Sequence, residues 1–170
     1  AAPATSWPEV ISRQSDQTQS LLRACESQLD SGYFSYGQTM CFQTRHNDEA
    51  FAIYYAPNNK DYPTPTDEKP PLIVLSHGGP TAMAEPSLDM RKQYWTSRGF
   101  ALLDVNYSGS TGFGRQYSER LNGQWGIRDV EDCCDTALYM VEQGVDDPER
   151  TSNKGDRAGG YTDVGAPSFR

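Results

Sequence analysis

The sequence predicts an α/β fold in which a mostly parallel sheet has helices on both faces and is preceded by an extended arm. Short apolar runs at residues 72–75 and 100–106 flank a stretch with helix-capping signals, a pattern typical of strand–helix–strand units. The order strand, helix, strand, helix, strand implies parallel pairing through right-handed crossovers. We therefore expect an N-terminal arm over residues 1–35 and an α/β domain over residues 36–170.

Composition limits the classes of partner. The 170 residues give room for one hydrophobic core and a long arm. The formal net charge of −8 and the sequence pI of about 4.7 argue against binding to nucleic acid or to an anionic membrane surface. No apolar run approaches the roughly 20 residues of a membrane-spanning helix, and no signal-peptide core is visible. The mean hydropathy of −0.73 is low for a self-sufficient core and fits a partial domain.

The first half of the chain is expected to hold strands and loops. The arm is predicted to turn in a hairpin at Ser15-Asp16-Gln17. Residues 38–56 read as two strands joined by a polar turn, in which His46 is expected to be a solvated loop residue. The second strand, Phe51–Tyr55, is apolar enough to be covered on both faces. Four prolines between Asn58 and Pro71 predict a surface loop.

Two helices are expected. Ser87 is predicted to cap the first, and Gly99 to end it. The second carries an apolar stripe at helical spacing, followed by Gly144 as its stop. The stripe consists of Val130, Cys133, Cys134, Ala137, Leu138 and Val141. Acidic residues at 129, 131 and 132 stand at the N-terminal end of this helix, where the helix dipole favours them.

Cysteines and glycines give no sign of a metal or cofactor site. None of the four cysteines has C-x-x-C spacing, and adjacent Cys133 and Cys134 are expected to be buried free thiols. Free thiols favour a reducing compartment, the cytosol or an organelle interior. A Cys25–Cys41 disulfide is the open alternative and would indicate an oxidising one. The glycines at 109, 112 and 114 fit neither phosphate-binding fingerprint and predict a turn-rich loop. We expect no cofactor and no metal.

Two glycine-rich turns carry the candidate chemistry. Residues 155–161 have the G-x-S-x-G frame of a nucleophile elbow, built on Gly155, Gly159 and Gly160, with Arg157 in place of serine. The Arg157 guanidinium has no hydroxyl and stays protonated, so it cannot attack a carbonyl.

The second turn is His77-Gly78-Gly79-Pro80, which follows the apolar run at 72–75. It matches an oxyanion loop, whose backbone N–H groups face a developing negative charge. The alternative interpretation is that this turn is kept only because it packs well.

Several segments together resemble the prolyl oligopeptidase (S9) serine peptidases, most of all the acylaminoacyl-peptidase and dipeptidyl-aminopeptidase-like branch. The resemblance covers roughly residues 35–170. The segments that carry it are Leu72–Pro80, Gln93–Ala101, Asp104–Tyr107, Gly109–Gly112, Gly123–Gly126 and Asp129–Cys133. The resemblance implies an α/β-hydrolase domain that follows a β-propeller, and peptide cleavage by a Ser–Asp–His triad. It also makes residues 7–30 similar to the end of the propeller.

The elbow departs from the family pattern. The family reads G-G-S-A-G-G-Y-T, so Asp156 and Arg157 differ from it while Ala158–Thr162 keep its register. The triad Asp and His of the family lie well beyond the elbow, where the sequence given has no residues.

We therefore expect the N-terminal part of an α/β-hydrolase domain, a half-sheet with flanking helices, that is degenerate at the elbow and non-catalytic. Such a chain would act as a structural or binding subunit of a larger assembly. The alternative is a fragment of an active serine peptidase whose triad is completed by other sequence. A protein partner is expected to cover the exposed sheet edge. A homo-oligomer is less favoured, because two acidic surfaces repel each other.

Overall fold

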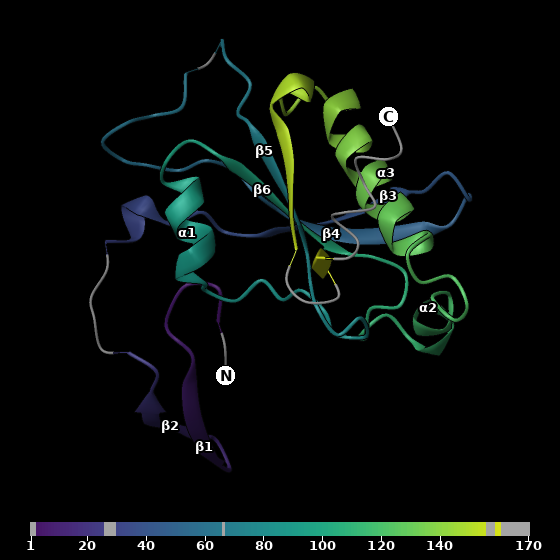
Figure 1. Ribbon diagram of the computed structural model, residues 1–170. Helices are drawn as coiled ribbons and strands as arrows, with labels where there is room; N and C mark the ends of the chain where they lie inside the picture. Colours follow the sequence, from purple (N-terminus) through teal and green to yellow (C-terminus); the bar gives the residue numbers. More distant parts are fainter. Residues whose placement is uncertain (1–2, 26–29, 66, 156–158, 161–170) are drawn as a thin grey trace.

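The computed structural model describes residues 3–25, 30–65, 67–155 and 159–160. These residues form a two-stranded hairpin and a five-stranded sheet of order β3-β4-β6-β5-β7 (Figure 1). The strands are β1 (Glu9–Gln14), β2 (Gln17–Arg23), β3 (Gln38–Gln43), β4 (Glu49–Tyr55), β5 (Leu72–Ser76), β6 (Ala101–Asn106) and β7 (Thr151–Gly155). The helices are α1 (Met90–Thr96), α2 (Arg115–Glu119) and α3 (Arg128–Glu142), with single 3-10 turns η1 (Ser31–Tyr33) and η2 (Pro148–Arg150).

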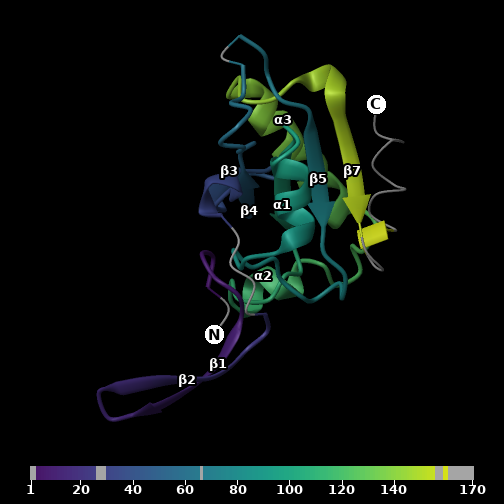
Figure 2. The ribbon, with the colours of Figure 1, turned by 90° about the vertical axis from the view of Figure 1, so that its left-hand side faces the viewer.

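The sheet is parallel in one half and antiparallel in the other. β5 pairs in parallel with β6 and with β7, as the strand–helix order predicts. β4 runs antiparallel to both β3 and β6. The polar strand β7 pairs with β5 only, so it forms the edge of the described sheet (Figure 2).

Helices cover both faces of the sheet, which confirms the α/β class. Successive side chains of a strand point to opposite faces. Leu103 of β6 joins the apolar cluster that holds Cys133 and Met140 of α3, whereas Leu102 joins the cluster against which Trp95 of α1 packs. The fully buried strand β6 therefore lies between the two helices as the centre of the core.

α3 bears out the predicted stripe with a small rotation. Val130 and Cys133 are buried against the sheet, whereas Leu138 is 57% exposed and Met140 is buried in its place. The buried face of α3 therefore runs through Val130, Cys133 and Met140. It is rotated away from Leu138, which the predicted stripe included. Gly144 ends the segment with a φ of +71°, as expected.

The predicted start of the first helix is wrong. α1 begins at Met90, and its N-cap is Asp89, whose side chain accepts a hydrogen bond from the backbone N–H of Arg91. Ser87 precedes it in an extended segment. An aspartate caps a helix as well as a serine does, and its carboxylate also meets the helix dipole favourably. Helix α2 was not predicted, since it is only one turn long and follows three glycines.

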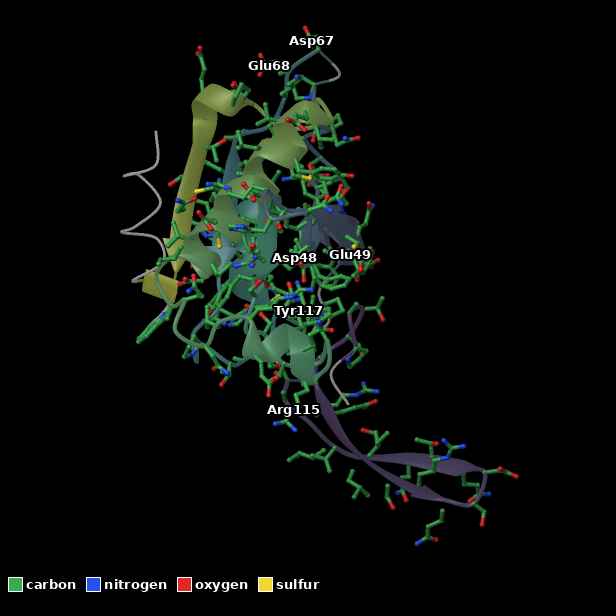
Figure 3. All side chains as sticks on the ribbon, turned by 90° about the vertical axis from the view of Figure 1, so that its right-hand side faces the viewer. Asp48, Glu49, Asp67, Glu68, Arg115 and Tyr117 are labelled. Carbon is green, nitrogen blue, oxygen red and sulfur yellow. The ribbon has the colours of Figure 1, made fainter. Side chains whose placement is uncertain are left out.

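His46 is an exposed residue of the β3–β4 turn, as expected, but its side chain also has a partner on α3. Nε2 of His46 lies 2.6 Å from Oε2 of Glu131, and Nη2 of Arg45 lies 2.7 Å from Oδ1 of Asp135. The next residues of the same turn, Asp48 and Glu49, lie beside α2 and α3 in Figure 3. The β3–β4 turn is therefore clamped to α3 by charged pairs.

The arm contains a β-hairpin that projects from the domain (Figure 2). Its turn lies at Ser15 and Asp16, as predicted. The hairpin carries exposed apolar side chains on both strands. They are Val10, Ile11, Leu21 and Leu22. The similarity of this arm to the end of a propeller stays a prediction.

None of the four cysteines forms a disulfide, so the alternative of a Cys25–Cys41 disulfide does not hold. Cys133 is buried and Cys134 half-buried, in fair agreement with the sequence, while Cys41 is exposed on the edge strand β3. No helix among the described residues combines the length and apolar character that crossing a membrane requires.

Asp146 is a buried acid in the connection between α3 and β7. Its Oδ1 accepts a hydrogen bond of 3.3 Å from the Tyr54 hydroxyl, and its Oδ2 has no hydrogen-bond partner among the described residues. Burial raises the pKa of Asp146 from 3.8 to about 6, although Tyr54 and Lys69 act in the opposite direction.

We predict that Asp146→Asn stabilises the protein in a pH-dependent way. Because folding favours the protonated carboxyl, the wild type loses stability as pH rises from about 4 through 6, and the neutral variant does not. The variant should gain on the order of 2 kcal/mol above pH 6 relative to the wild type, and the gain should disappear below pH 4. Urea unfolding at several pH values measures it.

Asp147→Asn is the matched control with the opposite sign. Asp147 Oδ2 accepts from Nε of Arg150 at 2.6 Å, and these contacts lower the pKa of Asp147. This variant should therefore lose stability at neutral pH. A gain for Asp147→Asn, or a pH-independent effect of Asp146→Asn, would contradict the assignment.

Candidate functional site

The elbow frame begins where β7 ends. Its first glycine, Gly155, is the last residue of β7, and the backbone at Gly159 and Gly160 is helical. A side chain at Gly155 would place its Cβ 2.2 Å from the carbonyl carbon of Gly159. The end of β7 and the helical backbone at Gly159 thus approach so closely that no side chain fits at Gly155, as expected for a nucleophile elbow.

The elbow frame and the second glycine turn meet at Ser76. The hydroxyl of Ser76 donates a hydrogen bond of 3.1 Å to the carbonyl of Gly159, and a Cβ on Gly159 would lie 2.2 Å from the Ser76 carbonyl oxygen. Ser76 ends β5, and His77-Gly78-Gly79 follow it directly. Parallel pairing of β5 with β7 thus brings together the two segments that sequence reasoning selected.

His77 is held on several sides. Its Nδ1 lies 2.9 Å from the carbonyl oxygen of Gly78, and its Nε2 lies 2.7 Å from the hydroxyl of Ser110. The Tyr107 ring stacks on the imidazole with centroids 4.3 Å apart, and the Tyr107 hydroxyl donates to the His77 carbonyl at 2.7 Å. Burial lowers the pKa of His77, with the Gly78 carbonyl and Asp104 acting in the opposite direction. The imidazole is therefore neutral at pH 7.

The rest of this loop is fixed by the end of β6. The Asn106 side chain accepts a hydrogen bond from the Ala84 N–H at 2.7 Å and donates one to the Ala84 carbonyl at 3.2 Å. Gly79 has a φ of +130°, and a Cβ there would lie 2.7 Å from the Ala82 nitrogen. The loop therefore has a defined conformation, because the Asn106 side chain holds its backbone and only glycine fits at position 79.

A cavity of about 380 Å³ adjoins the loop on the α1 side of the sheet. Its walls include His77, Trp95 and Lys154, and it also reaches a charged pair in which Nζ of Lys92 lies 2.6 Å from Oδ2 of Asp104. Burial opposes the charge on Lys92, yet Asp104 and Tyr55 hold the pKa of this lysine above its usual value. The pair is nearly neutral as a unit.

Arg157 lies outside the described residues, so the structure places the elbow glycines but not the nucleophile position. Sequence reasoning missed the hydrogen bonds that Ser110 and the buried Tyr107 make to His77. The available signal was the place of both residues immediately after an apolar strand, at the edge where parallel strands present their C-terminal ends. In the part of the chain that the structure describes, no three His, Cys, Asp or Glu side chains are grouped to hold a metal ion.

Comparison with known proteins agrees with this geometry. Residues 86–166 match the model of the prolyl oligopeptidase family. Dipeptidyl aminopeptidase BIII of Pseudoxanthomonas mexicana is 35% identical over 103 residues, which are 61% of this chain and 15% of that protein. The chain is similar to prolyl oligopeptidase (S9) peptidases, and the family model matches just under half of it.

Two further proteins are similar to the chain. The acylamino-acid-releasing enzyme of Arabidopsis thaliana is 36% identical over 91 residues, or 54% of this chain and 12% of that enzyme. A Mycobacterium tuberculosis puromycin-hydrolyzing peptidase superimposes with a TM-score of 0.95 at 34% identity, over 99% of this chain and 26% of the peptidase. The chain therefore corresponds to about a quarter or less of the length of these S9 proteins.

We predict that Gly159→Ala disrupts the elbow whereas Gly160→Ala does not. A methyl group at Gly159 would collide with the Ser76 carbonyl, while one at Gly160 meets no described residue within 4 Å. Gly159→Ala should cost about 1–3 kcal/mol, as overpacking does. Gly160→Ala should be neutral or stabilising by up to about 1 kcal/mol, because alanine favours a helix. Denaturant unfolding of the two variants checks this, and equal effects would contradict the close approach.

Proposed function

We propose that this chain contributes a non-catalytic S9 peptidase domain segment, which acts as a structural or binding part of a larger assembly. The observation that supports the proposal most directly is the arginine at the nucleophile position of an otherwise complete elbow frame. Acyl transfer in this family type needs a hydroxyl that a base can deprotonate, and a guanidinium supplies neither a nucleophile nor a proton acceptor. The loop at His77 is compatible with binding a carbonyl or carboxylate oxygen without cleaving a bond.

A second candidate is a segment of an active serine peptidase, of acylaminoacyl- or dipeptidyl-peptidase type, whose triad is completed by other sequence. The fully built loop at His77 favours it, since it keeps specific contacts to Tyr107 and Ser110 that packing alone does not require. The similarity to an enzyme named as a dipeptidyl aminopeptidase and to one named as an acylamino-acid-releasing enzyme also favours this candidate. This candidate requires a hydroxyl nucleophile from a position other than Arg157.

We predict that the purified chain does not react with a fluorophosphonate probe and does not release product from acyl-aminoacyl or dipeptidyl chromogenic substrates. Arg157→Ser should remain unlabelled as well, because a serine without a neighbouring base is a poor nucleophile. An active serine hydrolase in the same assay is the positive control. Stoichiometric labelling of the wild type would overturn the proposal. Labelling of Arg157→Ser alone would show that a base reaches position 157 and that the wild type lacks only the hydroxyl.

We further propose that another protein segment covers the open side of the sheet. Strand β7 has a partner on one edge only among the described residues, and its three central residues are exposed. On the α1 face beside it, Leu75 and Trp95 are only half-buried and line the cavity that also contains Lys154. Unpaired edges and uncovered apolar surface both favour association, at about 25 cal/mol per Å² of apolar area buried. We favour a different protein over a second copy, because of the net charge of −8.

We predict that the chain expressed by itself is oligomeric or molten. Size-exclusion chromatography should show species above 18.9 kDa, or near-UV circular dichroism should lack fixed aromatic signals. Asn153→Lys on the β7 edge should shift the distribution toward monomer, since edge lysines oppose strand pairing. Thr39→Lys on the other edge strand, β3, is the matched control and should change little. A monodisperse wild-type monomer that unfolds cooperatively would contradict the need for a cover.

A further inference from the structure

Two contacts of the His77 ring define where its protons lie. The Gly78 carbonyl can only accept, so Nδ1 satisfies it only by carrying a hydrogen, at a distance of 2.9 Å. In the neutral imidazole, Nε2 is then an acceptor. The hydrogen-bond partner at 2.7 Å from Nε2 is the hydroxyl of Ser110, which can donate to it.

The Ser110 hydroxyl has two acceptors and one hydrogen. Its Oγ lies 2.7 Å from Nε2 of His77 and 2.7 Å from the carbonyl oxygen of Tyr107. When the imidazole is neutral, the hydroxyl donates to Nε2. When Nε2 carries a proton, the hydroxyl accepts from it and donates to the Tyr107 carbonyl. Ser110 is fully buried, so both partners are protein atoms held within the core.

We propose that Ser110 and Tyr107 are positioning residues of the His77 loop. The Ser110 hydroxyl holds His77 in the Nδ1–H form and turns to the Tyr107 carbonyl when the imidazole takes up a proton. The Tyr107 ring and hydroxyl hold the imidazole plane and the His77 carbonyl in place. The inference concerns the same loop as the proposed function but needs no catalysis to be tested.

This arrangement sets the direction of a backbone donor. The C=O of Gly78 and the N–H of Gly79 belong to one peptide unit, and in a trans peptide they point in opposite directions. An Nδ1–H that holds the Gly78 carbonyl toward the imidazole therefore turns the Gly79 N–H away from it. The proton position on His77 thus fixes the orientation of an N–H in the loop that sequence reasoning assigned to oxyanion contact.

Burial favours the neutral form of His77 at pH 7, and the facing charges oppose it only in part. From β6, Asp104 faces it, but Lys92 of α1 pairs with that carboxylate. Lys154 of β7 and the acids Glu85 and Asp89 line the same cavity. Burial opposes the imidazolium. The hydroxyl therefore donates to Nε2 at neutral pH and changes its partner only in acid.

Nitrogen-15 NMR of the imidazole rings in the full chain tests the proposal, because the chain has only two histidines and His46→Gln removes the other signal. At neutral pH, His77 should show a protonated Nδ1 and a bare Nε2. Ser110→Ala should lower the pKa of His77 by about one pH unit, since an imidazolium loses more from a missing partner than a neutral ring does. Ser110→Thr, which keeps the hydroxyl, should restore the wild-type midpoint.

Tyr107→Phe separates the two roles. It keeps the stacked ring and removes only the hydrogen bond to the His77 carbonyl, so the His77 midpoint should stay while amide exchange at Gly78 and Gly79 becomes faster. If Ser110→Ala does not fold, Ser110→Cys replaces it, with a smaller fall in the midpoint. A wild-type His77 protonated at Nε2, or a midpoint unchanged without the Ser110 hydroxyl, would overturn the proposal. Neither result depends on fluorophosphonate labelling, so this inference and the proposed function fail separately.

Discussion

The site depends on one close approach, that of the Gly159 backbone to the end of β5. No side chain fits between Gly159 and the Ser76 carbonyl, and none fits between Gly155 and Gly159. This contact fixes how near the backbone at Gly159 lies to the loop that begins at His77. The parallel pairing of β5 with β7 brings the C-terminal ends of these strands together. Gly155 and Gly159 have no side chains, so the backbones can come into direct contact there.

The His77 loop is held from the side of β6 rather than by the elbow. Asn106, Tyr107 and Ser110 all follow or end that strand, and each contacts the loop through a short hydrogen bond. A central strand buried on both faces is a rigid support, so residues at its end are placed with little freedom. The contacts that specify the loop therefore come from the end of β6. Ser76, just before the loop, is the residue that contacts Gly159.

Sequence reasoning was most successful where burial dictates the pattern. The apolar runs gave β5 and β6, and helical spacing gave α3, because a sheet covered on both faces and an amphipathic helix leave clear periodicities. The polar strand β7 was located through the elbow frame alone. The failures involve choices between near-equal local options or long-range pairing. Asp89, not Ser87, caps α1. His46 contacts Glu131, which lies 85 residues away, so no local sequence pattern could predict the contact.

The geometry also shows why an elbow frame is a poor indicator of catalysis by itself. Gly155 and Gly159 are required by packing, because any larger residue would collide with backbone atoms that the sheet holds in place. A sequence can therefore keep these glycines for folding alone, whatever stands between them. Whether the frame presents a hydroxyl depends on residue 157 alone, which is arginine in this sequence.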